Sequence, residues 1–157
     1  MFRMILKYTL YALIGGFVVI QFIRPTKNIG KVHGANDINH VVNVPENVEA
    51  ILAKACYDCH SNNTNYPWYT NIQPFGWWIQ HHVDEGIEEL NFSEFKTYKL
   101  KRQRHKLHEC EEMIEEDEMP LNSYLWIHSE AKLTKEEKQA LITWVHESMH
   151  ALPAGND

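Results

Sequence analysis

Five consecutive residues, Cys56-Tyr57-Asp58-Cys59-His60, carry the side chains of this sequence that are best suited to do chemistry. They read C-x-x-C-H, the spacing at which two thiols can add across the two vinyl groups of a haem. The imidazole that follows is then held below the iron as its proximal ligand. The motif therefore predicts one haem c, attached covalently through Cys56 and Cys59, with His60 as an iron ligand.

Three other interpretations of the two cysteines compete with haem attachment. A zinc site needs two further ligands, and the remaining cysteine, Cys110, has no C-x-x-C partner around it. A thioredoxin-like redox pair needs a βαβ context, which the neighbouring sequence does not show. A plain disulfide between Cys56 and Cys59 stays open. We expect Cys110 to be a small buried side chain, with an intermolecular disulfide as the alternative.

A six-coordinate haem needs a second axial ligand opposite His60, and Met119 is our first candidate. Pro120 follows it and holds it in a non-helical loop, and a thioether ligand raises the potential of haem iron. His81 and His82 are the alternatives. Because adjacent residues on a helix point about 100 degrees apart, at most one of the two can face the iron.

An open sixth position is the third possibility, and it would change the expected function. The protein would then bind a ligand or act as a peroxidase, and Glu118 or the acidic run over 109–112 would supply acid or base groups. Five further histidines have charged neighbours on predicted helix faces, and we expect them to be solvated: His105, His108, His128, His146 and His150.

Residues 4–23 form an apolar run that is broken only by Lys7 and mildly polar residues. The run is long enough to cross a hydrocarbon core of roughly 30 Å as a helix. A polar stretch follows Ile23 in place of an A-x-A cleavage site, so we expect an uncleaved anchor rather than a signal peptide. Covalent haem attachment takes place outside the bacterial cytoplasm. Together the two features predict a single-pass protein of the bacterial inner membrane with its haem domain in the periplasm.

The rest of the chain predicts helices alone. Apolar spacing predicts helices over 46–55 and 76–90, and Ser93 fits the N-cap of a third that runs to about Glu116. Thr134 and Glu137 form a capping box that opens a last helix. Since no stretch alternates like a strand, the expected fold class is all-α, a cytochrome c-like helical domain behind one N-terminal transmembrane helix.

The composition divides the chain into four parts. We expect an anchor over residues 1–25, a polar tether over 26–44, a haem-binding domain over 45–150 and a disordered tail over 151–157. A net charge of −6 argues against binding of nucleic acid, whose phosphates demand a basic surface. The acidic surface would instead steer a basic redox partner toward the domain.

The pattern around the motif extends well beyond five residues. Residues 56–69 read CYDCHSNNTNYPWY, residues 77–82 read WWIQHH, and residues 91–93 read NFS. These stretches resemble a family of bacterial haem-binding domain proteins, over roughly Val44 to Met149. The resemblance implies c-type haem binding in a membrane-tethered or exported domain, without an assigned reaction. We therefore expect single-electron transfer, with a haem-based redox or gas sensor or a peroxidase-like enzyme as the alternatives.

Overall fold

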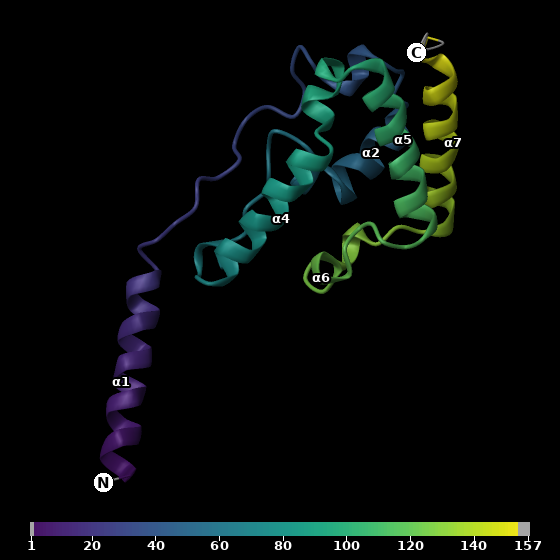
Figure 1. Cartoon of the computed structure of the whole chain (residues 1–157). Helices are drawn as coiled ribbons and strands as arrows, with labels where there is room; N and C mark the ends of the chain where they lie inside the picture. Colours follow the sequence, from purple (N-terminus) through teal and green to yellow (C-terminus); the bar gives the residue numbers. More distant parts are fainter. Residues whose placement is uncertain (1, 154–157) are drawn as a thin grey trace.

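The computed structural model of the chain describes residues 2–153 (Figure 1). Seven α-helices and four short 3-10 helices follow one another along these residues, and an isolated bridge between Ile29 and Asn63 is the one β-type pairing they contain. The predicted all-α fold is confirmed for this part of the chain. The α-helices are α1 (Phe2–Ile20), α2 (Glu46–Ala55), α3 (Tyr57–His60), α4 (Phe75–Glu89), α5 (Leu100–Glu115), α6 (Asn122–Leu125) and α7 (Lys135–Ala151). The 3-10 helices are η1 (Ile38–His40), η2 (Trp68–Asn71), η3 (Phe92–Thr97) and η4 (Ser129–Ala131).

Helix α1 stands apart from the domain, as the purple helix in Figure 1 shows. None of its described residues is buried, and it is long and apolar enough to cross a membrane. A helix that is largely apolar and unburied needs an apolar environment around it, which the domain does not supply.

The core forms where α5 and α7 pack side by side and α2 lies across α7 (Figure 1). Leu107 of α5 and Val145 of α7 are completely buried in it. The predicted capping box opens α7. The Thr134 hydroxyl accepts a hydrogen bond from the Glu137 backbone N–H, and the Glu137 carboxylate accepts one from the Thr134 N–H. The local sequence therefore fixes where α7 begins.

The helix expected from Ser93 to about Glu116 is wrong in its first part. Asn91, not Ser93, caps the short helix η3, and α5 begins only at Leu100. The Ser93 hydroxyl has other partners: it donates to the Val32 carbonyl at 2.5 Å and accepts from the Asn62 N–H at 3.1 Å. Contacts with remote segments thus override the local capping pattern.

The segment expected as a tether over 26–44 packs on the domain for part of its length. Ile38 is completely buried in the core, and Val42 is nearly so. The Gly30 N–H donates to the Asn62 carbonyl at 2.6 Å, an approach so close that a Cβ at residue 30 would meet this oxygen. In the expected tail over 151–157, Leu152 is buried, and residues 154–157 lie outside the described part of the chain.

Candidate functional site

The C-x-x-C-H motif lies at the break between α2 and α3. Cys56 ends α2, and the single turn of α3 carries Cys59 and His60. The Cys56 carbonyl accepts hydrogen bonds from the N–H groups of Cys59, at 3.1 Å, and His60, at 2.9 Å. This turn brings the two thiols and the imidazole together on one short piece of backbone.

The His60 ring is held in one tautomer by α4. Its Nδ1 lies 2.9 Å from the carbonyl oxygen of Gly86 and 2.9 Å from that of Leu90. Because a carbonyl only accepts hydrogen bonds, Nδ1 must carry the proton, and the lone pair of Nε2 is left free for a metal. Burial also lowers the pKa of His60, which keeps the ring neutral. The His60 ring is therefore neutral, with Nε2 free to bind a metal.

Two adjoining cavities meet at this motif. One, of about 380 Å³, lies among α2, α5 and α7, and the other, of about 500 Å³, lies between α3, α4 and the loop before α6. Cys56, His60, Glu89 and Met119 line both cavities. The structure therefore brings Met119, from a late loop of the chain, to the same space as the motif.

The backbone after α5 holds Met119 in place. Asp117 has φ 61°, the left-handed conformation that ends a helix, and the N–H of Glu118 donates to the Met113 carbonyl at 3.0 Å. Together with a bond from the Asp117 N–H to the Ile114 carbonyl, this is a Schellman motif. The Met119 N–H also donates to the Met113 carbonyl, at 3.1 Å. Met119 therefore has a fixed backbone position beside the cavities.

The two candidate histidines of α4 differ in where they lie. His82 lines the second cavity and has 29% of its side chain exposed. The His81 side chain is 64% exposed, pairs with Glu85, and lines neither cavity. Of this pair, only His82 lies beside the motif.

Four of the five histidines expected to be solvated are exposed, whereas the prediction for His128 is wrong. Its side chain is only 18% exposed. The ring stacks on Tyr124 with centroids 4.3 Å apart, and Nε2 lies 2.6 Å from the Tyr69 hydroxyl. Tyr69 of η2 and Tyr124 of α6 bury this ring. The nearby Glu130 suggested a solvated position, because the sequence does not indicate which aromatic residues pack on His128.

All three cysteines are free thiols. Burial raises the pKa of Cys56 to about 12 and that of Cys59 to about 11, so both are protonated. Cys110 lines the first cavity together with Cys56, and burial raises its pKa to about 12. Residues 2–153 contain no group of three or more His, Cys, Asp or Glu side chains placed to hold a metal ion, so the zinc alternative finds no further ligands there.

Lys106 is the one Lys or Arg side chain that lines either of these two cavities. Its ammonium lies 2.8 Å from a carboxylate oxygen of Glu89 and 2.6 Å from one of Glu109, and its side chain is 10% exposed. A cation with little access to water attracts carboxylates strongly. Both of these carboxylates belong to the protein, so the charge of Lys106 is already compensated.

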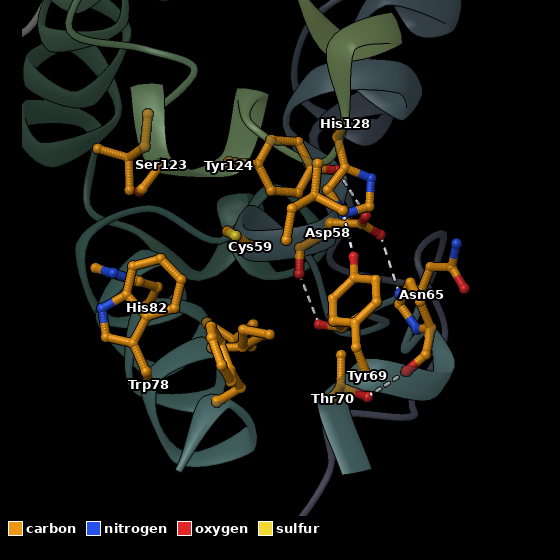
Figure 2. Close-up of a pocket in the computed structure, with 17 residues that line it drawn as sticks. Asp58, Cys59, Asn65, Tyr69, Thr70, Trp78, His82, Ser123, Tyr124 and His128 are labelled. Atoms are coloured by element: carbon orange, nitrogen blue, oxygen red, sulfur yellow. Dashed lines mark hydrogen bonds between the residues drawn. The ribbon is translucent and has the colours of Figure 1, made fainter. Parts of the chain in front are cut away.

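Three residues that sequence analysis missed shape the motif. Asp58, one of the two unspecified positions of C-x-x-C-H, accepts hydrogen bonds from the Asn65 N–H at 3.0 Å and from the Tyr124 hydroxyl at 2.8 Å (Figure 2). Gly86 lies so close to α3 that a Cβ would be 2.6 Å from the Cys59 carbonyl oxygen. Asp58 could have been noticed from its place in the motif, but neither Tyr124 nor Gly86 has a local sequence signal.

A comparison with known families identifies a match over most of the chain. A family model described as a haem-binding domain matches residues 15–147, a range that includes the motif, both candidate histidines of α4 and Met119. No curated protein and no solved structure matches the chain.

Proposed function

Because this chain belongs to the haem-binding domain family, we propose that it is a membrane-anchored, periplasmic c-type haem protein that transfers single electrons. The observation that carries the proposal is the convergence of Cys56, Cys59, His60 and Met119 on two joined cavities. The first cavity is lined largely by apolar side chains, which suits a flat, largely apolar macrocycle.

The donor set fits covalent attachment of haem. Cys56 and Cys59 are neutral thiols on one turn of chain. Each sulfur would form a bond to a vinyl carbon, and its proton would pass to the neighbouring vinyl carbon. This addition consumes no oxidant or reductant, and it requires both thiols to be free.

His60 and Met119 are the residues that would ligate the haem iron. The Gly86 and Leu90 carbonyls orient His60 and raise the basicity of its Nε2. Met119 would supply a thioether sulfur as the second protein ligand of the iron. When bound, the haem iron supplies a one-electron couple, whose potential a thioether ligand and apolar walls both raise.

Two features support the location, and the net charge indicates the kind of partner. The 19 residues of α1 form a helix of about 28 Å, which matches the hydrocarbon core of a bilayer. Covalent attachment through C-x-x-C-H requires a compartment outside the cytoplasm. The net charge of −6 favours a basic protein as electron donor or acceptor.

Ligation of iron by two histidines is the second candidate arrangement. His82 lines the second cavity together with His60, which favours it over His81 as a replacement for Met119. This arrangement would retain electron transfer, but at a lower potential than thioether ligation gives.

The spectrum of the full chain, purified in detergent after maturation with haem, tests the proposal. We expect a low-spin spectrum in the reduced state and a weak near-infrared band from methionine-to-iron charge transfer in the oxidised state. Met119→Ala should remove that band, whereas His82→Ala and the matched control His81→Ala should keep it. Absence of the band from a low-spin unmodified chain, together with conversion to a high-spin spectrum in His82→Ala but not in Met119→Ala, would establish the second arrangement.

Two results would overturn the proposal. A high-spin spectrum of the unmodified chain that shifts with carbon monoxide would indicate an open sixth position and refute an electron carrier with bound Met119. The double variant Cys56→Ala, Cys59→Ala should release all of its haem on extraction with acidified organic solvent. Haem that stayed covalently bound in this variant would refute the assignment of the attachment site.

A further inference from the structure

Six large apolar side chains are exposed at one end of the domain. We call them the aromatic rim: Trp68, Ile72, Phe75, Trp78, Trp126 and Ile127. Trp68 is 76% exposed and Trp126 is 81% exposed. Among described residues beyond position 29, no other large hydrophobic side chain is exposed. The exposed large apolar side chains of the domain therefore come from two stretches of the chain, residues 68–78 and 126–127.

The two segments that supply the rim are joined to each other. The Tyr69 hydroxyl of η2 lies 2.6 Å from Nε2 of His128, and the His128 ring stacks on Tyr124 of α6. Phe75, Trp78 and Ile127 of the rim also line one cavity, shown in Figure 2. The volume of that cavity is about 70 Å³, whereas ligand pockets begin at about 300 Å³. The rim therefore faces an extended surface and does not enclose a small molecule.

The rim lies beside the end of α1. The Gln21 side chain donates to the Gln73 carbonyl at 3.1 Å and accepts from the Gln73 N–H at 2.9 Å. The Trp77 indole N–H donates to the Ile23 carbonyl at 2.7 Å. In Figure 1 the lower end of α4 and helix α6 lie at the level of the upper end of α1. The rim is thus placed where a membrane-spanning α1 would leave the hydrocarbon core.

The charges around the rim suit the same location. Residues 61–80 and 119–128 contain no Asp, Glu, Lys or Arg, although 23% of the whole chain is charged. The nearest cations follow α1 directly: Arg24, and Lys27, whose ammonium lies 2.9 Å from the Asn71 side-chain oxygen. Aromatic side chains flanked by basic ones are typical of the headgroup region of a bilayer.

We propose that the aromatic rim inserts into the headgroup region of the bilayer that α1 spans. The domain then rests on the membrane in one fixed orientation, with α5 and α7 on the side away from the lipid. This inference rests on the proposed membrane span of α1. Its partner is the phospholipid itself, and the side chains that insert are the tryptophans and Phe75.

Photo-crosslinking to lipid tests the proposal on the full chain. The haem-loaded protein is reconstituted into nanodiscs that contain a phospholipid with a diazirine near the top of its acyl chain, and labelled peptides are mapped by mass spectrometry. We expect label in α1, in residues 68–78 and in residues 122–128, and none in α7. Label in α1 without label in the rim would overturn the inference and leave the rim as a surface for a protein partner. Absence of label from α1 would instead refute the membrane span.

A charge-insertion variant sharpens this test. Trp68→Glu, Trp126→Glu removes two exposed rings without disturbing the core, and it should abolish labelling of 122–128 while labelling of α1 stays unchanged. Gln139→Glu, on an exposed position of α7, adds negative charge away from the rim and should leave the whole pattern intact. Circular dichroism and the haem spectrum confirm that each variant is folded. Unchanged rim labelling in the folded double variant would refute insertion of the tryptophans.

Discussion

Replacement of Gly86 by alanine should damage the attachment motif through a contact between two helices. Gly86 lies in α4, and a Cβ there would be 2.6 Å from the Cys59 carbonyl oxygen and 3.0 Å from the Cys59 Cβ. The carbonyl of Gly86 itself accepts from Nδ1 of His60. A shift of α4 away from α3 would therefore relieve the clash only by weakening the bond that orients the imidazole.

Opposing effects determine how much Gly86→Ala changes the free energy of unfolding. In the interior of an unconstrained helix, Gly→Ala stabilises by about 1 kcal/mol. An added methyl group in a tight contact costs about 1 to 3 kcal/mol, and the upper part of this range applies because the contacting atom belongs to the backbone and cannot rotate away. Weakening of the His60 hydrogen bond costs about 1 kcal/mol more. The net loss of unfolding free energy should be about 2 to 3 kcal/mol.

Urea unfolding of the full chain in detergent measures this loss, and the haem spectrum reports on His60. The control is Gly34→Ala, since a Cβ at residue 34 meets nothing within 4 Å, and its stability should be unchanged. If Gly86→Ala were as stable as the parent and kept its spectrum, the close packing of α3 on α4 and its role in holding His60 would both be refuted.

Three further predictions concern the loops and caps around the site. Tyr124→Phe leaves one oxygen of Asp58 without its donor and should lower the free energy of unfolding by about 1 to 2 kcal/mol in urea titrations. Thr134→Ala removes the N-cap of α7 and should cost about 1 kcal/mol in the same assay, with unchanged haem absorption. Asp117→Gly should keep the near-infrared band of Met119, because glycine accepts φ 61°, whereas Asp117→Val should lose the band, since a β-branched residue does not adopt this conformation.

The helices could be predicted wherever the signal is local. The apolar spacing that predicted α2 and α4 and the capping box that predicted the start of α7 both depend on residues within two turns of one another. The prediction of Ser93 as an N-cap was wrong because its hydroxyl forms hydrogen bonds with Val32 and Asn62, which are remote in sequence. The prediction of a tether over 26–44 missed contacts of the same remote kind. Polar side chains of this segment form hydrogen bonds with the domain instead of facing water.

The candidate site likewise has a part that local sequence predicts and a part that depends on remote residues. The spacing of Cys56, Cys59 and His60 carries its own chemistry, so the sequence alone was enough to propose it. What the imidazole requires comes from elsewhere: the two carbonyls that receive its Nδ1 proton belong to Gly86 and Leu90, at the end of another helix. Every residue has a backbone carbonyl, so neither residue type nor spacing in the sequence could identify these two as partners of His60.

The choice between Met119 and His82 depends on how each residue relates to His60. His60 lines both cavities, and a second residue that would ligate the same iron should lie close to the space His60 faces. Met119 lines both cavities, whereas His82 lines only the second. The Schellman motif fixes the backbone of Met119 before any ligand binds. For these two reasons we favour Met119 over His82 as the second ligand of the iron.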